Sequence, residues 1–114
     1  MDIKFKIWLE KDGRVLFGHG REELLRAIEA CDSLSGAAKK LNMSYRAAWG
    51  RLKASEDRLG IQLVTRSRGK NMLLTPEAKN LLEQFDLLEK ETAEIMEAAY
   101  RKLSPIIDQS QQKK

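Results

Sequence analysis

The chain has 114 residues, with 21 lysines and arginines against 17 aspartates and glutamates, so its formal net charge is +4. This length suits one domain with a modest core, and no apolar run approaches the roughly 20 residues that a membrane-spanning helix needs. The charged N-terminus argues against a signal peptide, and the single cysteine cannot form an internal disulfide, so we expect a protein of the reducing cytoplasm without a membrane partner.

The N-terminal residues 3–17 predict a β-hairpin. Apolar residues alternate with mostly charged ones from Ile3 to Leu9, a period of two that is typical of a half-buried strand. The Asp-Gly pair that follows favours a tight turn, and Val15 to Phe17 would form the return strand. Gly18-His19-Gly20 is then expected to be a flexible link into a helix that runs from Arg21 to Cys31.

The stretch 35–59 predicts two helices joined by a tight turn. The first begins at Ser35, and Ser44 is placed to cap the second by accepting a hydrogen bond from a free backbone amide. Ala37-Ala38 and Ala47-Ala48 lie where small side chains let the two helices cross closely. This is the geometry of a helix-turn-helix, whose second helix enters the major groove of DNA with its N-terminal residues on base edges.

Residues 61–75 predict a second hairpin, because two short apolar runs flank a polar tip that contains glycine. A hairpin directly after a helix-turn-helix is the wing of a winged helix. Its cations, Arg66, Arg68 and Lys70, would face phosphates or the minor groove. The alternative is an ordinary solvated loop.

Charge is unevenly distributed along the chain. Residues 36–75 carry nine cations and two anions, a net charge of +7, whereas residues 76–103 carry four cations and seven anions, a net charge of −3. The basic segment can gain free energy by releasing condensed counterions from DNA. The acidic segment should be kept away from the phosphates.

From Pro76 an apolar stripe at spacings of three and four predicts a helix over residues 76–103, which Ser104-Pro105 would end. At about 1.5 Å per residue this helix is roughly 40 Å long, more than so small a core can cover. We therefore expect its distal part to pair with the same helix of a second chain; the alternative is that it folds back onto its own domain. The expected interface residues are Leu88, Thr92, Ile95, Met96, Ala99 and Leu103. Residues 104–114 are expected to be a flexible tail.

Together these elements predict a mainly α fold with small β content, an α+β winged helix-turn-helix. Residues 1–75 would form the DNA-binding domain, 76–103 the dimerisation helix and 104–114 the tail. We expect Tyr45, Arg46 and Trp49 in the major groove, although Trp49 could instead pack within the helix pair. Ser35, Ser44, Arg51 and Lys53 are expected to contact the DNA backbone, and Arg66, Arg68 and Lys70 to contact it from the wing.

Several runs of the sequence resemble the N-terminal DNA-binding domain of the molybdate-responsive regulator ModE family. They are the Leu-Leu-x-x-Ile helix at residues 24–28, Ser33 to Leu41, and Met43 to Trp49, of which Ser-Tyr-x-x-Ala-Trp is the most specific. More loosely, the sequence is similar to the winged helix of LysR-type regulators, because residues 59–66 and 74–78 match the borders of their wing.

The resemblance implies DNA binding and dimerisation in a prokaryotic transcriptional regulator. Full-length ModE proteins also carry C-terminal oxyanion-binding domains, and this sequence stops soon after the dimerisation helix. The resemblance therefore does not imply molybdate sensing. Three alternatives stay open: constitutive binding, control by expression level, and a separate sensor protein as a partner. The wing tip, Ser67 to Asn71, is shorter than many ModE-type tips, which leaves its minor-groove contact open.

Two other functions stay open. A winged helix can be a protein-interaction adaptor, but an adaptor would not need nine cations against two anions around its recognition helix. An RNA-binding module is not excluded by charge. An enzyme is not expected, because no nucleophile, paired-carboxylate or phosphate-loop pattern stands out. His19, the single histidine, has no nearby cysteine or histidine for a metal site, so neither metal nor cofactor is expected.

Overall fold

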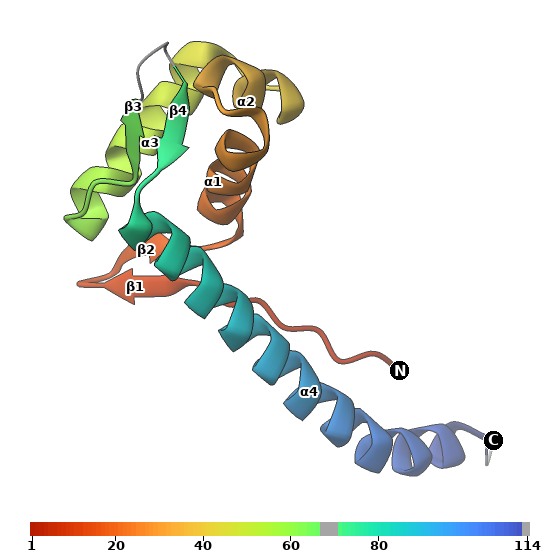
Figure 1. Ribbon diagram of the computed structural model, residues 1–114. Helices are drawn as coiled ribbons and strands as arrows, with labels where there is room; N and C mark the ends of the chain where they lie inside the picture. Colours follow the sequence, from red (N-terminus) through yellow and green to blue (C-terminus); the bar gives the residue numbers. More distant parts are fainter. Residues whose placement is uncertain (67–70, 113–114) are drawn as a thin grey trace. The chain divides into compact units, whose positions relative to one another are not determined.

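The computed structural model describes residues 1–66 and 71–112, which form four helices and two β-hairpins (Figure 1). In chain order the elements are β1 (Leu9–Lys11), β2 (Arg14–Phe17), α1 (His19–Cys31), α2 (Leu34–Lys40), α3 (Tyr45–Leu59), β3 (Val64–Arg66), β4 (Met72–Leu74) and α4 (Pro76–Gln112). The chain forms two compact units, one of residues Ile7–Leu82 and one of Met1–Lys6 with Glu83–Lys114. The predicted α+β content is confirmed.

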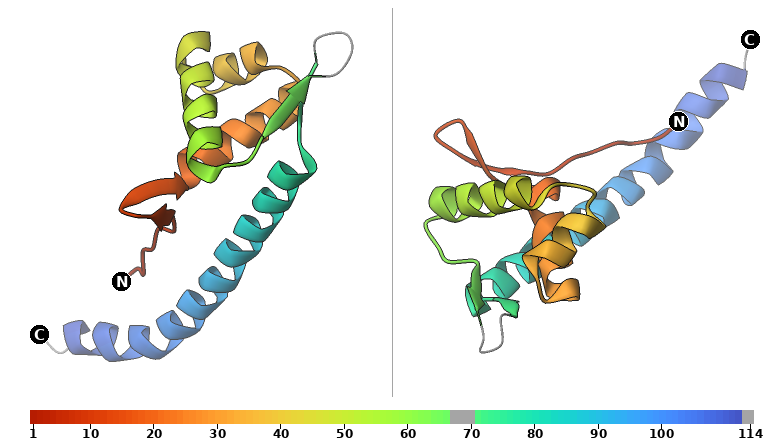
Figure 2. Two further views of the ribbon diagram at one scale, coloured as in Figure 1. Left: turned by 90° about the vertical axis from the view of Figure 1, so that its left-hand side faces the viewer. Right: turned by 90° about the horizontal axis from the view of Figure 1, so that it is seen from above.

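The core of the larger unit lies among α1, α2 and α3, which are grouped together in Figure 2. On α1 the side chains of Leu24, Leu25 and Ile28 are buried, at spacings that place them on one face of the helix. The other buried apolar side chains of this unit are Phe17, Ala27, Leu34, Ala37, Ala38, Ala48, Leu52, Leu63, Val64, Met72, Leu74, Ala78 and Leu82.

The helix-turn-helix depends on close packing of α2 against α3. Ala37 and Ala48 are both 0% exposed, so methyl-sized side chains fill the space that larger residues would occupy. Between the helices Asn42 has a left-handed backbone with φ 59°, a conformation that Asn adopts more readily than most residues. The prediction that Ala47 is buried beside Ala48 was wrong: Ala47 is exposed, because one step of about 100° turns it away from the core.

The first helix of this pair begins at Leu34, so the predicted start at Ser35 was wrong. Ser33 is the N-cap, with an extended backbone (φ −158°) and an Oγ that accepts the N–H of Gly36 over 2.9 Å. Ser35 therefore lies in the first turn of α2. A Cβ on Gly36 would lie 2.8 Å from Ser33 Oγ and 2.9 Å from Cys31 Cβ, so the cap requires glycine at position 36.

The N-terminal hairpin is shorter than predicted. Asp12 and Gly13 have φ values of 52° and 78°, which confirms the tight turn between the strands. The prediction of a strand from Ile3 was wrong, because β2 pairs only with Leu9–Lys11 and offers no backbone partners to residues 3–8.

The predicted flexible link at residues 18–20 was also wrong. α1 already begins at His19, with Gly18 as an extended N-cap. The N–H of Glu22 donates to the carbonyl of Gly18 over 2.9 Å, so a closed helical turn takes the place of a loose connection.

The hairpin predicted over residues 61–75 is present, with Val64 opposite Leu74 in its antiparallel register. The side chain of Thr75 makes two hydrogen bonds next to the hairpin. Its Oγ1 hydroxyl donates to the carbonyl of Gln62 over 2.7 Å and accepts the N–H of Ala78 over 3.2 Å. The second bond makes Thr75 the N-cap of α4. Arg68 and Lys70, expected at the wing tip, lie outside the described residues.

α4 continues through Pro105 to Gln112, so the predicted helix end at Ser104 and the flexible tail were wrong for residues 104–112. A proline inside a helix removes its own N–H donor and crowds the preceding turn, but it leaves the later turns able to form. The Oγ of Ser104 donates to Asp108 Oδ2 over 2.8 Å across this point.

Among the described residues, a search for helices with the length and hydropathy of a membrane span finds none.

We expect Leu52→Ala to lower the free energy of unfolding by about 2–5 kcal/mol, because the side chain is fully buried and its truncation leaves a cavity. Denaturant titration followed by circular dichroism measures the change. Leu73→Ala is the matched control, since Leu73 is 41% exposed on β4, and its loss should stay below about 1 kcal/mol. Equal losses would contradict this assignment of the core.

Candidate nucleic-acid interface

The first turns of α3 present a polar and aromatic surface. Ser44 caps the helix as predicted, because its Oγ accepts a backbone N–H of the first turn over 3.1 Å. Tyr45 and Trp49 are 50% and 39% exposed, and Arg46 is exposed beside them. The buried side of α3 is formed by Ala48, Leu52 and Ser55. Trp49 therefore lies on the outer surface and not in the core of the helix pair.

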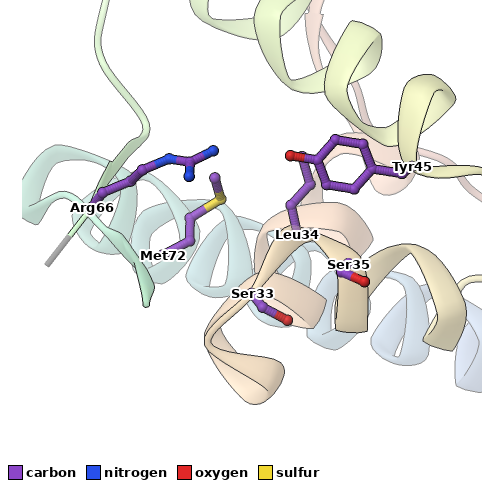
Figure 3. Close-up of a pocket in the computed structure, with 6 residues that line it drawn as sticks. All are labelled: Ser33, Leu34, Ser35, Tyr45, Arg66 and Met72. Atoms are coloured by element: carbon purple, nitrogen blue, oxygen red, sulfur yellow. The ribbon is translucent and has the colours of Figure 1, made fainter. Parts of the chain in front are cut away.

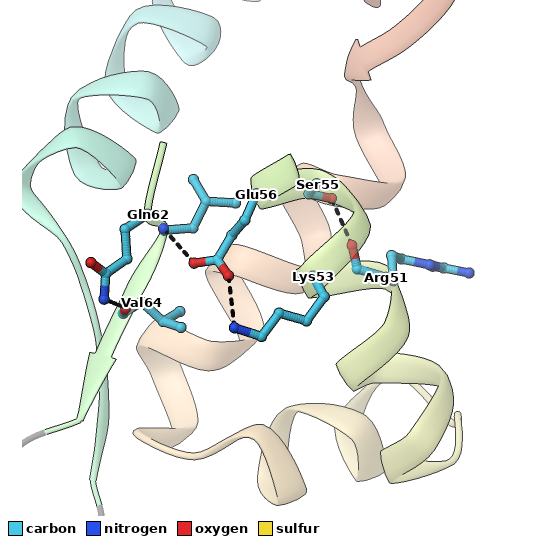
Figure 4. Close-up of polar contacts among 7 residues, drawn as sticks. Arg51, Lys53, Ser55, Glu56, Gln62 and Val64 are labelled. Atoms are coloured by element: carbon cyan, nitrogen blue, oxygen red, sulfur yellow. Dashed lines mark hydrogen bonds and ion pairs between the residues drawn. The ribbon is translucent and has the colours of Figure 1, made fainter. Parts of the chain in front are cut away.

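Lys53 is held on this outer surface by two contacts. Its Nζ lies 4.7 Å from the centroid of the Trp49 ring, a cation–π distance, and 3.3 Å from Oε1 of Glu56 (Figure 4). The Lys53 side chain is half exposed, so the ion pair contributes little to stability. These contacts keep the ammonium group beside the indole, about one helical turn beyond Trp49.

Glu56 also ties α3 to the segment that leads into β3. Its second carboxylate oxygen, Oε2, accepts the N–H of Leu63 over 2.8 Å (Figure 4). The Glu56 side chain is only 12% exposed, and a backbone amide that donates to a carboxylate makes a charge-assisted hydrogen bond. In the sequence Glu56 was visible only as an anion in a basic segment. Its spacing of three residues from Lys53 was the available signal.

A small cavity brings three predicted contact residues together (Figure 3). It has a volume of about 130 Å³ and is lined by Ser33, Leu34, Ser35, Tyr45, Arg66 and Met72. The phenol of Tyr45 and the guanidinium of Arg66 point toward one another across it, from the start of α3 and the end of β3. The Tyr45 hydroxyl and the Arg66 guanidinium are both hydrogen-bond donors, and such a pair suits a phosphate oxygen.

Arg51 does not lie with the other predicted contacts. Its side chain extends away from Lys53 and Glu56 (Figure 4). It lies toward the start of α1, where a Cβ on Gly20 would be 4.0 Å from Arg51 Nη1.

In the part of the chain that the structure describes, no group of three or more His, Cys, Asp or Glu residues could hold a metal ion.

Comparison with known proteins places this surface among DNA-binding regulators. A model of bacterial regulatory helix-turn-helix proteins of the lysR family matches residues 22–79. The chain is 39% identical over 74 residues to the transcriptional regulator ModE of Haemophilus influenzae, covering 61% of the chain and 29% of that protein. It is 30% identical over 100 residues to the molybdenum-pterin-binding protein MopB of Rhodobacter capsulatus, covering 84% of the chain and 37% of that protein. The chain thus spans about a third of the length of these curated relatives.

A solved structure of the CbnR DNA-binding domain in complex with DNA is also similar. The sequences are 25% identical, the TM-score is 0.53, and the match covers 68% of this chain and 92% of that one. The matched region of the family model contains α2, α3 and both wing strands. The resemblance to ModE and LysR-type DNA-binding domains that the sequence motifs indicated is therefore confirmed.

We expect Glu56→Ala to lower the free energy of unfolding by about 1–3 kcal/mol, because the Leu63 N–H loses its charged acceptor. Amide hydrogen exchange at Leu63, followed by NMR, should become faster. Asp57→Ala is the matched control, since Asp57 is exposed and makes no hydrogen bond or ion pair among the described residues. The same effect in both variants would show that loss of an anion, and not the bond to Leu63, is responsible.

Proposed function

The chain belongs to the LysR family of bacterial regulatory helix-turn-helix proteins, whose model matches just over half of it, and from this membership we propose that it is a sequence-specific DNA-binding transcriptional regulator that acts as a homodimer. The expectation that it is not an enzyme agrees with a family of regulatory proteins. Its site of action would be the cytoplasm, where bacterial operator DNA lies.

The observation that carries this proposal is the exposed start of α3 beside the wing. Tyr45, Arg46 and Trp49 project from the first turns of a helix that is packed against α2 by its opposite side. Arg46 makes no ion pair or hydrogen bond among the described residues. Its guanidinium is therefore able to donate two parallel hydrogen bonds to the edge of a guanine in the major groove.

Phosphate contacts would hold this helix in register. Ser35 and Arg66 border the cavity next to Tyr45, so a phosphate seated there would lie beside the start of α3. Ser44 at the N-cap and Lys53 over Trp49 extend the same surface. Contacts of this kind position a protein on the duplex without reading its sequence, and the +7 charge of residues 36–75 would add affinity through counterion release.

The distal part of α4 would form the dimer interface. Among the residues expected there, Leu88, Ile95 and Leu103 are 41%, 66% and 43% exposed. Thr92, Met96 and Ala99 are half-buried on the same helix. A row of exposed apolar side chains at helical spacing favours pairing with a second copy of the helix, which would remove that row from water.

Selection from a pool of randomised duplex DNA at near-physiological salt tests the proposal. We expect enrichment of an inverted repeat with half-sites about one helical turn apart, because two α3 helices related by a two-fold axis reach successive major grooves. Structured RNA serves as the competitor. Binding that is weak, unselective and lost as salt rises would instead favour a protein-interaction adaptor.

On the selected operator, we expect Arg46→Ala to weaken binding by about 1–3 kcal/mol, because a bidentate base contact is lost. Fluorescence anisotropy on the operator and on unrelated duplex measures the difference. Lys40→Ala, at the exposed end of α2, removes the same charge away from the first turns of α3. An equal loss for Arg46→Ala on both duplexes would show that Arg46 contacts only phosphates.

In sedimentation velocity runs we expect Ile95→Glu to shift the protein from dimer to monomer, because a carboxylate would be buried in an apolar helix pair. Ala98→Glu is the control, since it adds the same charge to α4 at an exposed position outside the apolar row. A parent protein that is monomeric at all concentrations, or an Ile95→Glu variant that stays dimeric, would rule out this interface.

A further inference from the structure

A cluster of arginines lies on a different side of α3 from Tyr45 and Trp49. Arg51 and Arg58 of α3 lie near Arg21 at the start of α1. Burial, and then repulsion from Arg58 and Arg51, lowers the pKa of the Arg21 guanidinium below its ordinary value. Arg58 Nη1 also donates to the carbonyl of Val15 on β2 over 3.2 Å, which fixes its position against the N-terminal hairpin. Arg21, Arg51 and Arg58 are called the arginine cluster below.

The cluster adjoins an open pocket between the N-terminal hairpin and the end of α3. This pocket has a volume of about 470 Å³ and is lined by Lys11, Asp12, Arg14, Leu16 and Arg58. Three of the five lining residues are cations, and one is an anion. A pocket of this size is within the range of small-molecule sites, which are about 300–1,000 Å³.

The positive charge here is only partly compensated, because the pocket lining holds three cations and one carboxylate, that of Asp12. Among the described residues, Arg14, Arg21, Arg51 and Arg58 form no ion pair with a carboxylate. Arg21 Nε is buried without a hydrogen-bond partner. Buried donors and clustered like charges cost free energy unless an opposite charge or an acceptor is present. Three guanidinium groups from two helices are thus held together at a cost that a bound anion would offset.

We propose that the arginine cluster and its pocket form a second anion site, which binds phosphate oxyanions. The guanidinium fork matches the oxygens of a phosphate in a bidentate manner, and a phosphate offers enough oxygens to accept from several arginines at once. The phosphates would belong either to a free phosphorylated compound or to the DNA backbone beyond the groove that α3 reads. The site goes beyond the proposed function, since the first of these sources needs no DNA.

Calorimetric titration of the whole chain with inorganic tripolyphosphate at constant ionic strength tests the site without DNA. We expect saturable binding that falls about tenfold or more in Arg21→Gln/Arg58→Gln, because charge-assisted hydrogen bonds from two guanidinium groups are lost. The matched control is Lys4→Gln/Lys6→Gln, which removes the same charge from exposed residues outside the larger unit. Equal affinities in parent and cluster variant, or an equal loss in the control, would overturn the proposal.

A second measurement separates binding from folding. Circular dichroism should show that Arg21→Gln keeps the melting temperature of the parent or exceeds it, because one of three like charges is removed. Tripolyphosphate should raise the melting temperature of the parent and leave that of Arg21→Gln/Arg58→Gln unchanged. A lower melting temperature of Arg21→Gln without phosphate would show that the cluster is structural, and would overturn the proposal.

DNA of two lengths identifies the source of the phosphate. A short duplex contains only the selected operator, and a long one extends it by about one helical turn, ~10 base pairs, on each side. If flanking DNA occupies the site, the parent gains affinity on the long duplex and the cluster variant loses only that gain. If both proteins bind both duplexes equally while tripolyphosphate still binds the parent, the source is a free compound. Affinity for the short duplex reports on α3 separately, so failure of the proposed function would be distinguishable.

Discussion

Close packing of α2 against α3 is the constraint on which the DNA-facing surface depends. Ala37 and Ala48 are completely buried where the two helices meet, and a larger side chain at either position would force them apart. The left-handed turn at Asn42 redirects the chain between them. Because α3 is held by this one side, its first turns project outward, and Tyr45 and Trp49 stay exposed although both are aromatic.

Two basic surfaces of α3 differ in whether a carboxylate of the same chain is paired with their cations. Glu56 accepts a hydrogen bond from the Leu63 backbone and keeps Lys53 over Trp49. One carboxylate therefore positions both the segment that leads into β3 and a cation of the outer surface. Among the described residues, the arginine cluster has no carboxylate that forms an ion pair with it. On one basic surface of α3 the carboxylate of Glu56 positions the cation. The other basic surface, the arginine cluster, is the one that we propose binds an external anion.

Much of the fold could be predicted from the sequence, because short-range rules control it. The helical spacing of α1, the Asp12-Gly13 turn and the cap at Ser44 each depend on residues close in the chain. The errors arose where the outcome depends on distant residues. Alternation from Ile3 predicted a strand, yet a strand needs a partner and β2 is too short to supply one. Pro105 predicted a helix end, yet α4 continues past it.

For the interface, the sequence by itself determined the residue types, their order along α3 and the basic charge of the segment. Only the tertiary structure decided which of them are neighbours. Arg66 and Tyr45 line one cavity because the wing folds back beside the start of α3, and Arg51 lies near Arg21 and extends away from Lys53. The physical reason is that contacts between distant residues depend on how helices and strands pack, which a local pattern of apolar and polar residues does not specify.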